Sequence, residues 1–234
     1  MLTSVVIPAL NEAENITHCI AAARREYTPQ EVELLVTDGG STDGTLDLIP
    51  SDVLVVASPR GRAVQMNAGA AASRGAILAF CHADSLLPAG WREAVLEALN
   101  DPEVSGGTFQ TLILPAESRL LRWRNRVALP AQWRGMFGDQ VQFMRRSTFE
   151  AVGGFPEIPL MEDVEMSRAL HRRGRLVRID PASRVTTSSR RFRERGALRQ
   201  TLLNGWNLFR YLYLGVSPEA IARTYRSTRE QSLG

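Results

Sequence analysis

Short apolar runs alternate with helix-like segments over the first part of the chain. Four runs have the length and β-branched content of buried strands, and they cover residues 4–7, 32–37, 53–56 and 76–81. Segments with helical character separate them, at residues 11–25, 46–49 and 63–72. This alternation predicts an α/β fold, in which a Rossmann-like, mostly parallel sheet carries helices on both faces. Asn11, with Glu14 three residues later, is predicted to cap the first helix.

The second part of the chain has a less regular pattern. Strands are expected at residues 104–114, 140–144, 176–179 and 184–187, and helices at residues 91–99, 118–133, 160–173 and 197–213. No long linker and no internal repeat divides the sequence. We therefore predict one domain over residues 1–234. It has a regular half at residues 1–100, a smaller subregion at residues 101–195 and C-terminal amphipathic helices at residues 196–234.

Each of the four N-terminal strands is followed by polar or conformationally special residues. In chain order these are Pro8, Asn11 and Glu12; Asp38; Arg60 and Arg62; and His82 and Asp84. Because the carboxyl ends of parallel strands share one edge of the sheet, these residues are expected to lie near one another, where α/β sheets bind ligands. Carboxylates can hydrogen-bond a base or ribose, and arginines can bind phosphates. The edge therefore predicts a nucleotide site, with His82 and Asp84 as two potential metal ligands.

Several other functional classes lack their signature in this sequence. Neither G-x-x-x-x-G-K-[ST] nor G-x-G-x-x-G occurs, which argues against P-loop enzymes and nicotinamide-dependent dehydrogenases. In Gly39–Asp43 an aspartate replaces the second glycine of a serine-hydrolase elbow. The net charge is only +3, from 28 basic and 25 acidic residues, so nucleic acid is not an expected partner.

The sequence also bears on localisation. Residues 1–8 lack the charged region and cleavage site of a signal peptide. No apolar run reaches the roughly 18–20 residues that a membrane-spanning helix needs. We therefore predict a cytoplasmic protein, with peripheral contact to the inner face of the membrane left open.

Five short motifs in fixed order carry a family likeness. They are residues 6–12, 38–45, 82–84, 153–155 and 162–163, with sequences VIPALNE, DGGSTDGT, HAD, GGF and ED. Together they resemble the family-2 glycosyltransferases, and most closely the small single-domain bacterial members. The resemblance implies a GT-A fold and an inverting transfer of sugar from a UDP- or GDP-linked donor to a hydroxyl acceptor. It also implies a divalent cofactor, Mn²⁺ or Mg²⁺, at the diphosphate.

The resemblance also implies a role for each residue at the strand ends. Pro8, Asn11 and Glu12 would wrap the nucleoside, Asp38 would bind the base, and Arg60 and Arg62 would approach the phosphates. Asp84 matches the last carboxylate of the D-x-D motif that holds the metal. His82 stands where the first aspartate is expected, and its softer imidazole suits Mn²⁺ better than Mg²⁺.

Catalytic and acceptor residues are assigned by the same resemblance. Asp163 matches the usual base, and Glu162 beside it is the alternative, because adjacent carboxylates at a helix start point in different directions. Asp139 and Gln140 are candidates for acceptor binding. Two other functions stay open. A sugar nucleotidyltransferase would need a glycine-rich basic loop that residues 8–11 lack, and a nucleotide-sugar-binding protein without catalysis would fit the histidine at position 82.

Two interpretations of the aromatic C-terminal stretch also stay open. The helix at residues 197–213 either covers the core, as amphipathic helices usually do, or lies on an anionic lipid surface. The first is favoured, and the second would suit a lipid-linked acceptor. The residues concerned are Trp206, Phe209, Tyr211 and Tyr213, beside Arg199 and Arg210.

Overall fold

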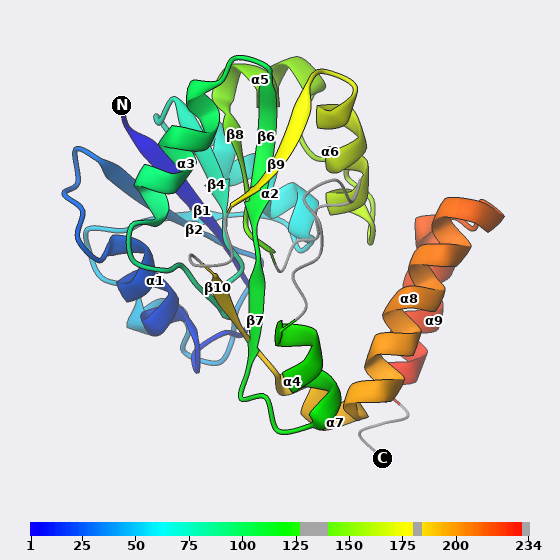
Figure 1. Ribbon diagram of the computed structural model, residues 1–234. Helices are drawn as coiled ribbons and strands as arrows, with labels where there is room; N and C mark the ends of the chain where they lie inside the picture. Colours follow the sequence, from blue (N-terminus) through cyan, green and yellow to red (C-terminus); the bar gives the residue numbers. More distant parts are fainter. Residues whose placement is uncertain (127–139, 180–183, 231–234) are drawn as a thin grey trace.

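A seven-stranded sheet forms the centre of the computed structural model, which describes residues 1–126, 140–179 and 184–230 (Figure 1). The strand order is β3-β2-β1-β4-β8-β6-β9, and only β8 runs antiparallel to its neighbours. The predicted mostly parallel sheet is therefore confirmed. The strands are β1 (Thr3–Ala9), β2 (Val32–Asp38), β3 (Leu54–Ala57), β4 (Ile77–Phe80), β6 (Val104–Phe109), β8 (Gln142–Arg145) and β9 (Arg175–Ile179).

Helices cover both faces of this sheet. Successive side chains of a strand point to opposite faces, and in the buried strands the side chains on both faces are apolar. Val5 and Ile7 of β1 pack in one apolar cluster with α1 (Ile16–Arg24) and α3 (Trp91–Asn100). Val6 packs in a second cluster, on the other face. That cluster includes α2 (Arg62–Ala72), α5 (Arg146–Val152) and α6 (Glu162–His171). The central strands are thus apolar on both sides, which explains their continuous hydrophobic runs.

The first helix begins later than the sequence pattern predicts. Its N-cap is Asn15, and Asn11 lies upstream with a left-handed backbone, at a φ of 55°. The Asn11 amide N–H donates to Ser41 Oγ, and its side-chain Oδ1 accepts from the Thr42 N–H. The predicted cap at Asn11 is wrong because its polar groups bind the loop after β2, and asparagine tolerates this backbone conformation.

Residues 104–114 form two strands where the alternation predicts one. The chain leaves the central sheet after β6, and β7 (Thr111–Leu114) pairs with β10 (Val185–Ser188). The two-residue β5 (Ser85–Leu86) completes this small sheet, in the order β5-β10-β7. Because β5 directly follows Asp84, the small sheet fixes the turn at the end of β4 against the second half of the chain.

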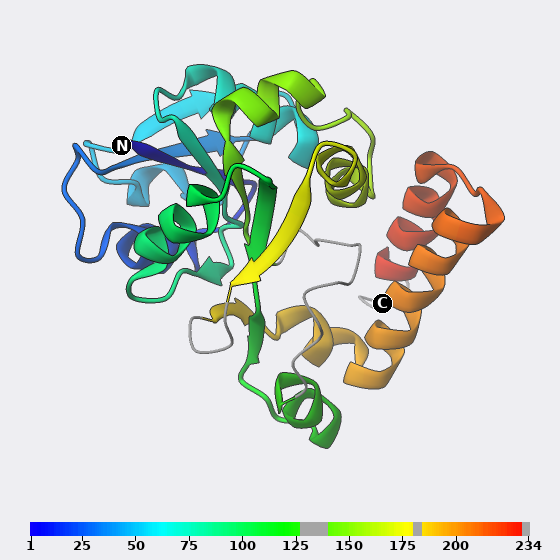
Figure 2. The same ribbon diagram turned by 45° about the horizontal axis from the view of Figure 1, so that its top comes forward.

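The C-terminal helices stand to one side of the sheet. Besides the helices already described, the structure contains α4 (Arg119–Arg126), α7 (Arg190–Arg195), α8 (Ala197–Leu214) and α9 (Pro218–Glu230). A short 3₁₀ helix, η1 (Leu46–Leu48), lies near the N-terminus. Helices α8 and α9 form a hairpin beside α6 (Figures 1 and 2). The Tyr211 hydroxyl donates to Glu165 of α6 over 2.7 Å, which ties the hairpin to the rest of the molecule.

The aromatic side chains of α8 do not cover the core. Trp206, Phe209 and Tyr213 are exposed, whereas Gln200 and Asn207 of the same helix are buried. The favoured interpretation of this stretch is therefore wrong for these three aromatic residues, because the polar side of α8 turns inward. No described helix is both long and apolar enough to cross a membrane.

Candidate functional site

A cavity of about 360 Å³ lies between the carboxyl edge of the central sheet and α8. Its wall on the sheet side includes Arg62 at the start of α2, His82 and Asp84 after β4, and Asp163 in the first turn of α6. These residues are far apart in sequence. The fold thus brings four of the predicted site residues to one cavity.

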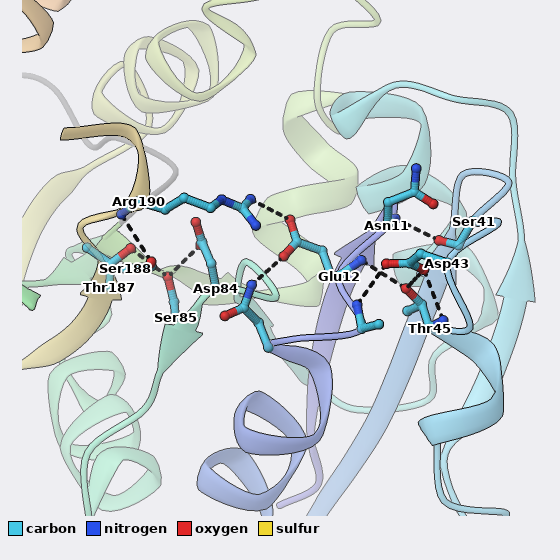
Figure 3. A network of polar contacts seen from close by, with 12 residues as sticks. Asn11, Glu12, Ser41, Asp43, Thr45, Asp84, Ser85, Thr187, Ser188 and Arg190 are labelled. Carbon is cyan, nitrogen blue, oxygen red and sulfur yellow. Dashed lines mark hydrogen bonds and ion pairs between the residues drawn. The ribbon is translucent and has the colours of Figure 1, made fainter. Parts of the chain in front are cut away.

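The turn after β4 holds Asp84 at the cavity wall. The Ser85 N–H donates to the His82 carbonyl over 2.9 Å, and the Ser188 N–H of β10 donates to the Asp84 carbonyl over 3.1 Å. The Ser85 hydroxyl lies 3.4 Å from Asp84 Oδ1. In Figure 3 the Asp84 carboxylate points in the direction of the Arg190 and Glu12 side chains. The backbone around Asp84 is therefore fixed from both sheets.

Glu12 is held by two partners from different parts of the chain. Its Oε1 lies 3.4 Å from an Arg190 guanidinium nitrogen, and its Oε2 accepts from Asn15 Nδ2 over 2.7 Å (Figure 3). Arg190 opens α7, so this ion pair joins the C-terminal region to the loop after β1. Arg190 was not predicted as a site residue. The available signal is the cluster of arginines between residues 172 and 199, which could bind phosphate groups but fits a solvated face equally well.

The loops after β1 and β2 carry the residues predicted to bind the nucleoside, and they bind each other. Besides the contacts of Asn11, the Glu12 N–H donates to Thr45 Oγ1, and the Ala13 N–H donates to Asp43. The carboxylate of Asp38 accepts from the Gly40 and Ser41 N–H groups of its own loop. Asp38 therefore shapes the loop in which it lies. Pro8 is buried within β1.

Arg62 and Glu162 form an ion pair of 2.7 Å between the first residues of α2 and α6. The Glu162 side chain is only 1% exposed, and Arg62 is 34% exposed. Burial raises the pKa of Glu162, the Arg62 charge opposes that increase, and the neighbouring Asp163 adds to it. Glu162 is therefore turned into the protein beside Arg62, whereas Asp163 lines the cavity.

The first turn of α6 is fixed from two sides. The Asp163 carbonyl accepts from Gln142 Nε2 of β8 and from the Ser167 hydroxyl, and its Oδ1 accepts from the Val164 N–H over 2.8 Å. Met161, just before the helix, has a φ of 71°. These contacts orient the Asp163 backbone relative to the sheet.

Asn67 of α2 binds the short motif at residues 153–155 to this helix. Its side chain donates to the Phe155 carbonyl over 2.8 Å and accepts from the Phe155 N–H over 2.9 Å. Gly154 has a φ of 76°, and a Cβ atom there would lie 2.9 Å from Asn67 Oδ1. A glycine at position 154 is thus needed to admit this contact.

The other predicted residues lie outside the main cavity or outside the described residues. Arg60 is exposed after β3 and does not line the cavity. Gln140 is buried and lines a smaller neighbouring cavity of about 100 Å³, together with Asn125 and Arg178. Asp139 lies in the segment that is not described.

His82 and Asp84 offer an imidazole and a carboxylate to the same cavity. Among residues 1–126, 140–179 and 184–230, no group of three or more histidine, cysteine, aspartate or glutamate side chains is placed to hold a metal. A divalent cation bound in enzymes of phosphate chemistry commonly takes one or two protein ligands and completes its shell with phosphate oxygens and water. The donor set fits a metal shared with a bound diphosphate.

The sheet order and its edge cavity define an α/β protein of the nucleotide-binding type. The chain belongs to glycosyl transferase family 2, because the model of that family matches residues 4–156. This confirms the family predicted from the five motifs. The match ends before α6, so the C-terminal helices lie beyond it.

Curated relatives with glycosyltransferase names match parts of the chain. Glycosyltransferase AglE of Haloferax volcanii is 36% identical over 99 residues, which cover 38% of this chain and 33% of AglE. The probable glycosyltransferase YdaM of Bacillus subtilis is 27% identical over 206 residues, which cover 77% of this chain and 49% of YdaM. The chain thus spans half or less of the length of these relatives.

Solved structures confirm the GT-A fold. S. aureus TarS in complex with UDP superposes with a TM-score of 0.66 at 15% identity, covering 80% of this chain and 60% of that one. The mannosyltransferase PcManGT of Pyrobaculum calidifontis, in complex with GDP-Man and Mn²⁺, gives a TM-score of 0.57 at 22% identity. That match covers 80% of this chain and 56% of PcManGT.

Proposed function

We propose that this protein transfers a sugar, with inversion, from a UDP- or GDP-linked donor to the hydroxyl group of an acceptor. The observation that carries the proposal is the single cavity lined by Arg62, His82, Asp84 and Asp163. These side chains supply cationic, metal-ligating and basic groups in one space. Proteins of the same fold have been solved with UDP-GlcNAc and with GDP-Man and Mn²⁺, which supports this type of donor.

The donor would lie along the carboxyl edge of the sheet. The coupled loops after β1 and β2, with Asn11, Glu12 and Asp38, would hold the nucleoside. Arg62 would face the diphosphate, with Arg60 at the outer rim. His82 and Asp84 would hold Mn²⁺ or Mg²⁺, which stabilises the negative charge of the leaving nucleoside diphosphate.

Asp163 would accept the proton of the attacking acceptor hydroxyl. It lines the cavity, whereas Glu162 is buried and engaged by Arg62. Glu162 is thereby better placed to position Arg62 than to act as the base. A single displacement that uses one carboxylate base inverts the configuration at the sugar carbon.

Nucleotide binding and its dependence on Asp84 test the proposal. Calorimetry should show binding of UDP or GDP that strengthens with Mn²⁺. Asp84→Ala should lower metal-supported donor turnover by about 100-fold, since a bound cation contributes several kcal/mol. Glu97→Ala, an exposed carboxylate on α3, should behave as wild type.

The other outcomes separate the remaining functions. Failure to bind either nucleotide would contradict the proposal. Donor turnover that is unchanged in Asp84→Ala would remove the metal role from this residue. Tight nucleotide-sugar binding without transfer or donor hydrolysis would instead favour a binding protein. Formation of a nucleotide sugar from a sugar phosphate would favour a nucleotidyltransferase.

We also propose a cytoplasmic location with peripheral contact to an anionic bilayer through the outer face of α8. This face consists of Leu198, Leu202, Trp206, Phe209 and Tyr213, which are 43–74% exposed and follow one side of the helix. The α8 sequence contains two arginines and no carboxylate, and the adjacent α4 contains four arginines and none. Aromatic and aliphatic side chains beside arginines match an anionic lipid surface in charge and polarity.

Vesicle sedimentation tests this contact. The protein should sediment with vesicles of phosphatidylcholine and phosphatidylglycerol more than with phosphatidylcholine alone, and added salt should weaken the difference. Trp206→Ala should weaken binding roughly tenfold, because it removes a large exposed apolar side chain. Leu54→Ala, which removes an exposed leucine from β3, is the control. A concentration-dependent dimer that Trp206→Ala abolishes would assign the face to a second copy of the chain.

A further inference from the structure

The side of α8 that faces the cavity carries a row of amide side chains. Gln200, Asn204 and Asn207 follow one another at spacings of four and three residues, which places them on one face of the helix. All three line the cavity, across from the wall that contains Asp84 and Asp163. The two walls thus present different chemistry: titratable groups on the sheet side and neutral amides on α8.

Among these three amides, Asn207 gives the strongest indication of a bound ligand. Its side chain is 3% exposed, and its Oδ1 has no hydrogen-bond partner among the described residues. Leaving a buried acceptor unsatisfied costs about 1–3 kcal/mol. A bound molecule with a hydroxyl donor would remove that cost.

The neighbouring amides are held in a defined orientation. Gln200 Nε2 donates to Asn204 Oδ1 over 2.7 Å and lies 3.4 Å from the Tyr225 hydroxyl of α9. Because the Asn204 oxygen is engaged, its amide N–H groups are the part available to a ligand. Asn204 therefore offers donors and Asn207 an acceptor, one helical turn apart.

This pattern matches a neutral molecule with neighbouring hydroxyl groups, since each hydroxyl can both donate and accept. Phe192 and Leu208 also line the cavity and provide apolar surface for the carbon skeleton of such a molecule. A diphosphate does not suit this wall, because the arginines that line the cavity, Arg62 and Arg124, come from α2 and α4 and not from α8. The donor phosphates belong on the sheet side, near Arg62.

We infer that the inner face of α8 is the acceptor site and that it binds a sugar or another polyol through Asn204 and Asn207. The inference rests on the proposed glycosyl transfer, for which it names the acceptor class. Helix α8 lies beyond the residues matched by the family model, so this recognition is a property of this chain's C-terminal region. Gln200 also supports the α8–α9 pair through Tyr225, and the test therefore uses the other two amides.

Side-chain amide NMR signals provide the test. The ¹⁵N-labelled full chain, with UDP and Mn²⁺ bound, would be titrated with methyl glucoside, methyl mannoside and glycerol, and separately with 1-propanol, which has one hydroxyl. The Asn204 and Asn207 amide signals should move with at least one polyol and not with 1-propanol. Asn207→Ala and Asn204→Ala should each weaken polyol binding roughly five- to tenfold, as expected for one or two lost neutral hydrogen bonds.

Matched variants keep the result interpretable. Leu202→Ala, on the outer face of α8, should leave polyol binding unchanged. Asn204 is exposed, so Asn204→Ala tests the inference even if Asn207→Ala does not fold. Absence of any polyol response while UDP still binds would overturn the acceptor site and leave the proposed function standing. An equal response to 1-propanol would overturn the polyol class, and failure of UDP itself to bind would overturn both proposals.

Discussion

Asp163→Asn should lower the rate of sugar transfer by about 10²–10⁴-fold, the usual contribution of a positioned general base. The asparagine keeps the size of the side chain and its place in the first turn of α6, but it cannot accept the acceptor's proton. Nucleotide binding should stay close to wild type, because the proposed nucleotide contacts come from other residues and Arg62 is already paired with Glu162. Transfer would be measured with sugar donors linked to whichever nucleotide, UDP or GDP, binds more tightly in calorimetry.

Two comparisons make this result specific. Glu157→Gln changes an exposed carboxylate shortly before α6 and should leave transfer unchanged. Melting temperatures of both variants would show that the fold is intact. Full transfer activity in Asp163→Asn would show that another residue is the general base, and Glu162 would then be the next carboxylate to replace.

Arg62→Ala should lower the free energy of unfolding by about 3 kcal/mol, because it leaves the carboxyl group of Glu162 buried without its cation. Arg60→Ala, two residues away, removes an exposed arginine and should have little effect on stability. Urea unfolding of both variants would give the comparison. Glu162→Gln in the Arg62→Ala background should restore part of the loss, since the uncharged amide is less costly to bury.

The sign of the pH dependence follows from the pKa of Glu162, which burial raises. Loss of Arg62 removes the group that opposes this increase. A buried carboxyl with a raised pKa contributes its stability at low pH and loses it as the pH rises and the group ionises. The defect of Arg62→Ala should therefore shrink on mild acidification. A defect that stays constant with pH, or that Glu162→Gln does not relieve, would contradict the assigned pair.

The regular half of the fold was predictable because its strands are short, apolar and separated by helical segments. The ends of β1, β2 and β4 carry polar residues of the proposed site, and the edge of a parallel sheet brings them together. The division into β6 and β7 was not predictable, because alternation shows which side chains share a face and not which sheet receives the strand. The predicted helix start at Asn11 was wrong for a related reason: the local pattern does not show that Asn11 contacts Ser41, and this contact replaces local capping.

The candidate site likewise contains residues that the sequence predicts and residues that it does not. His82, Asp84 and Asp163 belong to ordered motifs, and the structure brings all three to one cavity. Arg190 and Asn207 come from the C-terminal helices, and their places depend on how those helices pack against the rest of the molecule. The local sequence of α8 shows two chemically different sides, but it does not say which of them faces inward.

The width of helix α8 sets the distance between its exposed apolar face and the cavity. One side of it is apolar and exposed, and the opposite side lines the cavity, so the two environments are separated only by the width of the helix. An α-helix with its side chains is about 10 Å across. An acceptor anchored in a bilayer on the outer side would need to place its reacting hydroxyl about that far above the lipid surface. The length of the polar segment between anchor and hydroxyl would then decide which acceptors can react.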